Sequence, residues 1–419
     1  MNIRTYSFDR QKDEKMKSSI MKNAGAMTAA AMAYYLVQFG TQYIGYNYLP
    51  IYIEALPFAT NSTVGLVTAV GAATTVLAQP VWGSLADHAK TKNRILLIAI
   101  ILQALTGLLF FSEIPNLWLF LLCTVLFYVP FLAPQVLIDT ISVENLGKLK
   151  VRFGTLRCFG SGGAALMAFI FGFVSDMTNA KAFTLFCVFS AASILPMLLL
   201  PRTEGHARTS GRKVSFTVLL KNGRFMLFLF YGFALFLCGT MILTFMPIFF
   251  ITEKGLNAGV DVYSLFFGFT ILLEALLMFF GSRIVAKMNP YVVFLIPLAA
   301  GIFRAFLPVL AGVWQDMLLY PLFHALWFAP MWAKVPTYIQ AVVPPEMRAT
   351  GQSVWTIVTC GIAPVIGSLA AGWLSDWIEI RYMFLVVAVM LAVFTVLFAV
   401  LFFFRQRADR REGWRMEEG

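Results

Sequence analysis

Charged residues are scarce in this sequence. Asp, Glu, Lys and Arg together make up only 13% of its 419 residues, while apolar residues make up 59%. Soluble domains are about a quarter charged, so this chain has too few polar side chains to cover a surface in water. A lipid bilayer removes that requirement, because lipid accepts apolar side chains on every side of a helix. The scarcity of charge therefore excludes an ordinary soluble protein and predicts an all-α membrane protein.

Histidine and cysteine are scarce as well. The three histidines are far apart in the sequence, and the five cysteines all lie inside apolar stretches. Neither residue shows the spacing of metal ligands or of a disulfide framework. The sequence also lacks a glycine-rich phosphate-binding loop ending in Lys-Ser or Lys-Thr, which argues against an ATP-driven pump. We expect no metal site, no cofactor and no enzymatic activity, since an intramembrane enzyme needs a metal cluster or a nucleophile–base pair.

Long apolar runs, by contrast, fill most of the chain. A membrane-spanning helix needs about 20 mainly apolar residues, and twelve runs of this kind are present. Their predicted ranges are 24–51, 64–86, 95–112, 117–139, 153–175, 181–200, 225–251, 262–284, 291–310, 317–342, 351–375 and 382–404. The net charge of +11 lies in short clusters between the runs. Such clusters orient helices in a membrane, so we expect no nucleic-acid partner.

The polar segment 201–224 divides the runs into two groups of six. We predict a six-helix bundle over 24–200, a cytoplasmic linker over 201–224 and a second bundle over 225–404, between tails at 1–23 and 405–419. Most Lys and Arg residues fall on the side that carries both tails. This bias predicts that both termini are cytoplasmic, in a multi-pass protein of the inner (plasma) membrane. The first segment is polar and mixed in charge, so we expect the first apolar run to be an uncleaved anchor.

Short matches between the two groups indicate an internal repeat. Gly172-Phe-Val-Ser-Asp176 resembles Gly372-Trp-Leu-Ser-Asp376, and Gly83-Ser84 resembles Gly281-Ser282, in each case six helices apart. Two homologous halves predict a binding site between them, near the middle of the bilayer. Glycine-rich helix ends that recur by chance are the alternative explanation.

Small residues gather in the same helices and predict close helix packing. Backbones approach each other most closely where a helix presents glycine. The glycines to which we assign this role are Gly160, Gly162, Gly163, Gly361, Gly367 and Gly372.

Four ionisable residues lie deep inside predicted spans of the second half. They are Glu274, Arg304, His324 and Lys334. A charge at mid-membrane costs roughly 2.5–3.5 kcal/mol on insertion scales, so each needs an explanation. Glu274 and Arg304 could form a purely structural bridge, or they could exchange partners as Glu274 gains and loses a proton. His324 adds a group that titrates near neutrality, and Lys334 could simply extend to the membrane surface. We predict that Glu274, Arg304 and His324 couple a proton, and that Arg304 also binds substrate.

The first half carries a second polar set. Asp139 ends the run 117–139, and Arg157 lies near the start of the run 153–175. Gln38, Tyr43 and Asn47 lie in the first run, where Gln38, Gln42 and Tyr46 or Asn47 fall at helical spacing on one face. We predict that Asp139, Arg157, Gln38, Tyr43 and Asn47 bind substrate. A solvated face for Asp139 and Arg157, and interhelical hydrogen bonds for the other three, are the alternatives.

A loop between the second and third runs carries a recognisable motif. Gly83-Ser-Leu-Ala-Asp87-His-Ala-Lys-Thr-Lys92 resembles the loop motif of the major facilitator superfamily. The resemblance implies a fold of two six-helix bundles, with Gly83, Asp87 and Lys92 helping to keep the cytoplasmic side closed. The usual arginine after the aspartate is His88 here. In the second-half copy, Val285 stands in place of the aspartate.

Other positions resemble the lactose permease and phenylpropionate permease branch (MFS_1-like) of that superfamily. Asp139 precedes Arg157 by the spacing of the acidic–arginine sugar-binding pair in that branch. Glu274, Arg304 and His324 also fall where the branch carries an acid, an arginine and a histidine. Ala164 replaces the tryptophan that stacks on the sugar, and Trp327 replaces a second acid. The resemblance therefore does not imply a galactoside, and it leaves Glu274, then Asp139, as the proton carrier.

These observations predict a monomeric secondary active transporter. The expected activity is proton-coupled symport of a small organic solute, such as a sugar, a nucleoside or an aromatic acid, by alternating access. A drug/proton antiporter or exporter is one alternative, because 41 Phe and 19 Met residues could line a promiscuous pocket. A membrane sensor of the same fold that moves no solute is another. Such a sensor would have no need of Glu274, Arg304 and His324.

Overall fold

The computed structural model describes residues 25–112, 114–149, 151, 153–174, 177–205, 219, 221–344 and 347–411. The predicted N-terminal tail, most of the predicted linker and the end of the C-terminal tail lie outside these ranges. Arg152 and Asp176 also lie outside them. All regular elements in the described part of the chain are helical, which confirms the predicted fold class at that level.

The first half begins with one long helical segment. Residues 25–43 are α-helical, and the helix continues through the π-helical turn η1 (Ile44–Tyr48) into α2 (Leu49–Glu54). The elements that follow are α3 (Asn61–His88), α4 (Lys92–Gly107), η2 (Leu108–Phe110), α5 (Leu117–Phe131), α6 (Ala133–Glu144), α7 (Leu146–Leu149), α8 (Phe153–Phe173), α9 (Asn179–Ala192) and α10 (Ile194–Met197).

The second half follows the same plan. Its elements are α12 (Gly223–Ile251), α13 (Val260–Lys287), α14 (Pro290–Leu310), η3 (Trp314–Met317), α15 (Tyr320–Val342), α16 (Arg348–Thr356), η5 (Ile357–Ile362), α17 (Ala363–Trp377) and α18 (Ile380–Arg411). The π-helical segment η5 joins α16 to α17, so that residues 348–377 form one continuous helical stretch.

Polar caps and prolines set several helix boundaries. The side chains of Thr60 and Asn116 accept hydrogen bonds from backbone N–H groups in the first turns of α3 and α5, and Asn222 does the same for α12. These bonds satisfy donors that a helix start leaves unpaired. Pro130 and Pro134 flank the break between α5 and α6, because proline supplies no N–H to the helix ladder.

Among the described residues, ten helices are long and apolar enough to cross a membrane. These ten correspond to ten of the twelve predicted runs. The helical segment 25–54 and α15 correspond to the other two but are not among the ten. The chain is therefore a multi-helix membrane protein, and the count of twelve spans stays a prediction.

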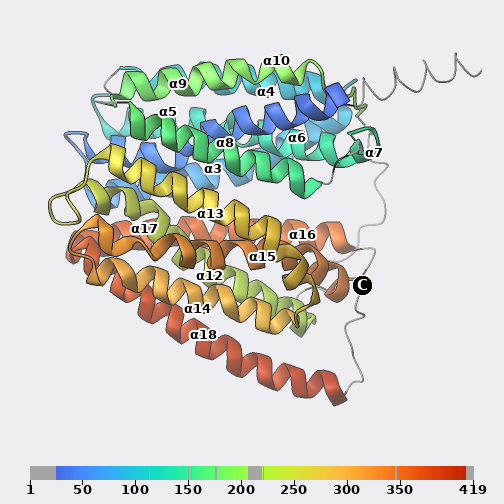
Figure 1. The fold of residues 1–419 in the computed structure, drawn as a ribbon, viewed down its shortest axis with the longest axis vertical. Helices are drawn as coiled ribbons and strands as arrows, with labels where there is room; N and C mark the ends of the chain where they lie inside the picture. The colour runs from blue at the N-terminus through green and yellow to red at the C-terminus, as the bar shows by residue number, and fades with distance from the viewer. Residues whose placement is uncertain are drawn as a thin grey trace, which may run out of the picture.

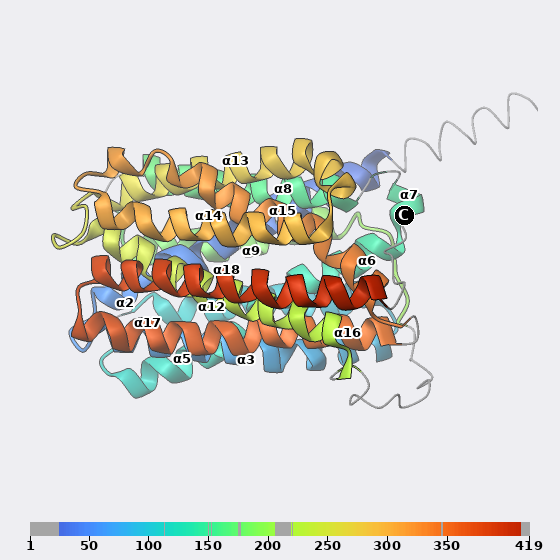
Figure 2. The same cartoon turned by 90° about the horizontal axis from the view of Figure 1, so that it is seen from below.

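The helices lie side by side in two groups (Figures 1 and 2). Elements up to α10 form one group, and α12 to α18 form the other. The start of the first helix and the last turn of α18 lie at the same end of the molecule, which we call the terminal end, and the opposite end is the far end.

The two groups contact each other mainly at the far end. Helix α8 packs along α13, and α3 packs along α17. The contacts involve the ends of α8 and α17 and the starts of α13 and α3, and we call this zone the far-end interface. A Cβ atom added to Gly172 would lie 2.5 Å from Leu265, and one added to Gly372 would lie 3.0 Å from the Cα of Gly65. Both distances are shorter than ordinary Cβ contacts, so glycine lets α8 approach the side chain of Leu265 and lets the backbones of α17 and α3 touch.

Candidate functional site

A buried acid–histidine pair lies inside the second half. Glu274 occupies the middle of α13, and its Oε2 lies 3.1 Å from Nε2 of His324 on α15. Glu274 is 6% exposed and His324 is 4% exposed. An ionisable carboxyl group removed from water this far is costly unless it is hydrogen-bonded. The pair therefore provides a place where a proton can be held between two side chains.

Arg304 of α14 lies beside this pair and is completely buried. Its Nε donates a hydrogen bond to the hydroxyl of Tyr320 at 2.9 Å, and its guanidinium carbon lies 4.6 Å from the centre of the Trp327 ring. Within the described residues, neither Nη1 nor Nη2 has a hydrogen-bond partner. Cation–π contact compensates only part of the lost hydration, so Nη1 and Nη2 are available to a carboxylate or carbonyl oxygen.

The structure assigns different partners from those suggested by the sequence. The hypothesis that Glu274 pairs directly with Arg304 does not hold here, because Glu274 bonds to His324 and Arg304 bonds to Tyr320. The sequence analysis missed Tyr320, and it noted Trp327 only as a departure. Both lie on the same face of α15 as His324, at helical spacing, which is the signal that could have found them.

The predicted pair Asp139 and Arg157 comes together in the first half. Nη1 of Arg157 donates to Oδ2 of Asp139 at 3.0 Å, and each side chain is 27% exposed. The Tyr35 hydroxyl donates to Oδ1 of the same carboxylate at 2.6 Å. The guanidinium carbon of Arg157 also lies 5.0 Å from the ring centre of Phe39. Tyr35 and Phe39 were not predicted, although they lie one turn apart on the helix that carries Gln38 and Tyr43.

The three predicted residues of the first helix point in different directions. Gln38 is fully buried and donates to Oε1 of Gln103 on α4 at 2.7 Å, which matches the alternative of an interhelical hydrogen bond. Tyr43 donates to the hydroxyl of Ser264 at 2.8 Å. Asn47, in the π-helical turn η1, accepts from the hydroxyl of Tyr263 at 2.8 Å. Tyr43 and Asn47 thus bond across to α13 in the other half.

The loop motif forms a compact cluster at the terminal end of the first half. Lys92 is 3% exposed and bonds to the carboxylate of Glu144, which the sequence analysis missed. Its Nζ also lies 3.8 Å from Oδ1 of Asp87. The backbone N–H of Lys92 donates to Thr203 at 2.8 Å. A Cβ atom added to Gly83 would meet nothing within 4 Å, so this glycine makes no close packing contact here.

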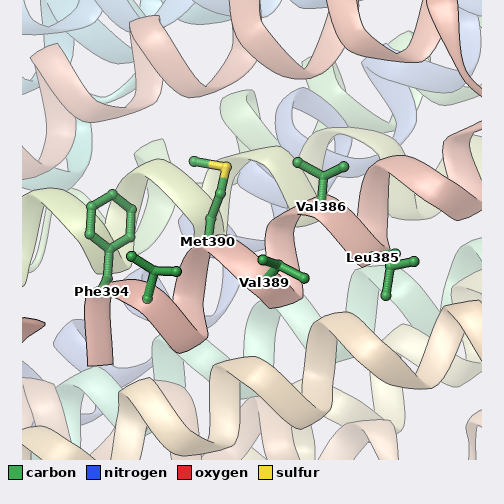
Figure 3. A pocket seen from close by; sticks show the side chains of 6 residues that line it. Leu385, Val386, Val389, Met390 and Phe394 are labelled. Carbon is green, nitrogen blue, oxygen red and sulfur yellow. The ribbon is translucent and has the colours of Figure 1, made fainter. Parts of the chain in front are cut away.

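A pocket of about 390 Å³ lies along α18 (Figure 3). Its lining residues are Leu385, Val386, Val389, Met390, Val393 and Phe394, and no polar atom lines it. Such a surface on an apolar helix suits lipid acyl chains better than a polar solute. The buried polar clusters are therefore stronger candidates for a binding site. No group of three or more His, Cys, Asp or Glu side chains gathers as metal ligands in the part of the chain that the structure describes.

Comparison with known sequences identifies the family. The model of the MFS_1 like family matches residues 30–386. The chain belongs to this family. The predicted membership of the major facilitator superfamily is thereby confirmed. YwbF, an uncharacterised transporter of Bacillus subtilis (strain 168), is 23% identical over 371 residues, which cover 86% of this chain and 90% of YwbF. The maltose permease of Geobacillus stearothermophilus is 26% identical over 179 residues, which cover 43% of this chain and 44% of the permease.

Solved structures support the same fold. A variant of the nucleoside transporter NupG superposes with a TM-score of 0.78 at 17% identity, covering 90% of this chain and all of the NupG chain. At this identity the likeness shows the fold alone. Together with the family, it makes the chain a multi-pass membrane transporter rather than an enzyme.

Proposed function

We propose that this MFS_1 like family member is a proton-coupled symporter of a small organic solute in the inner (plasma) membrane. It works as a monomer with twelve spans and cytoplasmic termini, and it needs no cofactor beyond the proton gradient. The observation that carries this proposal is the buried set Glu274, His324 and Arg304. Three ionisable side chains gathered inside one half cost stability, which a purely structural protein or a sensor would have no reason to bear.

Partner exchange within this set gives the proposed coupling step. When Glu274 is ionised, it attracts the guanidinium of Arg304, whose Nη1 and Nη2 are unsatisfied in this structure. When Glu274 gains a proton, that attraction is lost, and the two nitrogens of Arg304 become free to bind a polar group of the solute. His324, 3.1 Å from Glu274, relays the proton. Solute and proton then enter together, because each favours the same arrangement of Arg304.

The first half supplies the facing part of the proposed site. Asp139 and Arg157 are each about a quarter exposed, so a solute can reach them without a prior change of conformation. Tyr43 and Asn47 bond to α13 at the far-end interface, and these bonds support assigning the structure to the inward-facing state. Gly83, Asp87 and Lys92 would then help to close the opposite, cytoplasmic side in the other state. Alternating access follows if the two closures form in turn.

The membrane potential provides enough free energy to accumulate a solute inside the cell. One proton that moves inward contributes about 2.3 kcal/mol per 100 mV of membrane potential. Since each 1.4 kcal/mol corresponds to a factor of ten, this accumulates solute roughly 50-fold before any pH gradient is added.

Proton movement on addition of solute to proteoliposomes tests this function. The medium is lightly buffered, and the panel contains sugars, nucleosides and aromatic acids. Symport alkalinises the medium with one solute, and Glu274→Gln abolishes the signal because glutamine cannot carry a proton. Glu253→Gln, which changes an exposed carboxylate in the far-end loop before α13, serves as the control and keeps the signal.

The sign of the pH change separates symport from its rivals. Acidification on adding a solute would replace symport with drug/proton antiport. Uptake without any proton signal would make the protein a facilitator. A signal that persists unchanged in Glu274→Gln would make that residue structural and move the test to Asp139.

A further inference from the structure

The start of α3 has an unusual supply of hydrogen-bond acceptors. A helix leaves its first four backbone N–H groups without partners inside the helix. The local cap, Thr60, accepts from the N–H of Thr63 at 3.1 Å. The N–H groups of Asn61 and Ser62 instead donate to the two carboxylate oxygens of Asp376, at 2.9 and 3.0 Å. One carboxylate thus satisfies two consecutive donors of a 28-residue helix.

Asp376 does not belong to the half that contains α3. It lies in the last turn of α17, more than 300 residues further along the chain. A third bond, from Nδ2 of Asn61 to the carbonyl of Ser375 at 2.8 Å, reinforces the contact. One turn deeper, Gly65 and Gly372 bring the two backbones together. The cap therefore exists only while the start of α3 and the end of α17 are in contact.

The electrostatics of this arrangement favour closure. A helix N-terminus carries the positive end of the helix dipole, and a carboxylate placed there is stabilising. In most helices the capping residue is local and stays in place whatever the rest of the molecule does. Here Thr60 accepts from one backbone N–H group, and Asp376 of the other half accepts from two. Separating the halves at the far end leaves both donors without this acceptor.

We infer that Asp376 is a positioning residue of the transport cycle, which caps α3 across the far-end interface and stabilises the state with a closed far end. This inference rests on the proposed function insofar as the cycle opens and closes that end. Opening releases the cap, and closing re-forms it.

Distances between spin labels on the two halves test the inference. In a background without the five native cysteines, one label pair uses the exposed positions Ala55 and Lys254 at the far end, each changed to Cys. Asp376→Ala should raise the population with a longer far-end distance about fivefold, the effect of losing a typical cap. Asp376→Asn, which keeps the shape but loses the charge, should give a smaller rise. Glu379→Gln, an exposed carboxylate three residues away, should change nothing.

A second label pair at the terminal end separates repositioning from mere loosening. Lys90 and Gln340, both exposed and each changed to Cys, report on that end. If Asp376 sets the position of the halves, the terminal-end distance shortens in the same proportion of molecules in which the far-end distance lengthens. Equal broadening at both ends, or unchanged distances in Asp376→Ala, would overturn the inference.

The donor side provides an independent check. Thr60 has an extended backbone (φ −131°, ψ 166°), which is compatible with proline at the next position. Asn61→Pro removes the N–H that Asp376 accepts, together with the side-chain bond, whereas Asn61→Ala removes only the side-chain bond. Asn61→Pro should therefore open the far end more than Asn61→Ala. Adding Asp376→Ala to Asn61→Pro should have less effect than it has in the wild type, and full additivity would contradict the cap.

These measurements need neither solute nor protons. A wild type that takes up solute without any proton signal, combined with the expected shifts in distance, would refute the symport proposal and leave the cap in place. Proton-coupled uptake combined with unchanged distances would do the reverse.

Discussion

At the scale of single residues, burial gives each charged side chain a different balance of cost and compensation. Asp139 receives two hydrogen bonds, one of them from Arg157, and stays partly in contact with solvent. Arg304 is fully buried, donates one hydrogen bond and makes two aromatic contacts. An ion that is removed from water without a bonded counter-ion lowers stability. We therefore expect the two arginines to respond in opposite ways to substitution.

Arg304→Met should raise the midpoint of thermal unfolding. The change removes a buried guanidinium with two unsatisfied nitrogens and keeps a long apolar side chain, a gain of about 1–3 kcal/mol. Transport should be lost at the same time, because the proposed partner of Glu274 is gone. Thermal unfolding of the purified protein in detergent and uptake into liposomes measure the two effects. Arg304→Lys, which keeps the charge, is the control and should not stabilise. A lower midpoint in Arg304→Met would show that Arg304 holds the fold together.

Asp139→Asn should lower the unfolding midpoint. It leaves Arg157 without its carboxylate partner, which costs about 1–2 kcal/mol for a partly exposed pair. The double variant Asp139→Asn with Arg157→Gln should recover most of that loss, since neither charge remains. Both variants should fail to transport. A double variant no more stable than the single one would mean that Arg157 does not depend on Asp139.

At the scale of helices, glycine decides which backbones can touch. A Cβ atom added to Gly163 of α8 would overlap the backbone of Leu36 in the first helix, and one added to Gly160 would come 2.9 Å from the ring of Phe39. Gly162, although predicted to pack closely, would meet nothing within 4 Å. The three glycines are alike in sequence, but successive positions on a helix face different directions.

Gly163→Ala and Gly162→Ala form a matched pair. The first should destabilise the protein by about 1–3 kcal/mol, because the new methyl group forces the first helix away from α8. The second should be neutral or slightly stabilising, because alanine favours a helix more than glycine does. Unfolding midpoints of the two variants in the same detergent provide the comparison. Equal effects would contradict the packing described here.

At the scale of the whole molecule, the two halves hold together at one end. The contacts at the far-end interface depend on small residues in four helices, on the hydrogen bond that Tyr43 donates and on those that Asn47 and Asp376 accept. Contacts between packed elements tend to switch between discrete arrangements rather than deform gradually. The far-end interface is therefore expected to open as a unit.

Gly65→Leu should force the far end open. A larger side chain at this position collides with the backbone of Ser368 and Gly372, so the closed arrangement becomes unfavourable. Ser375 is 5% exposed in the closed state, and a cysteine at that position should react with a membrane-impermeant maleimide several-fold faster in the variant. Gly154→Leu, at a glycine with open space around it, is the control and should leave the reaction unchanged. An unchanged rate in Gly65→Leu would mean that the far end closes without this contact.

The class of the protein and most of its helices follow from the sequence alone. Apolar runs long enough to cross a bilayer can be read locally, because lipid imposes the same requirement on each helix separately. The rarity of ionisable residues inside such runs likewise singled out Glu274, Arg304, His324, Asp139 and Arg157. The resemblance to the acidic–arginine pair of the lactose permease branch also implied that Asp139 and Arg157 lie together, as they do at 3.0 Å.

Tertiary structure alone decided which buried groups meet. Glu274 bonds to His324 rather than to Arg304, Gln38 bonds to Gln103 of α4, and Gly162 faces open space. Each outcome depends on how helices that are distant in sequence rotate and cross, and a rotation of one residue moves a side chain by about 100°. Asp376 is the clearest case, since its partners on α3 lie in the other half of the chain. The sequence determined what had to be buried, and the packing of the two halves determined what each buried group touches.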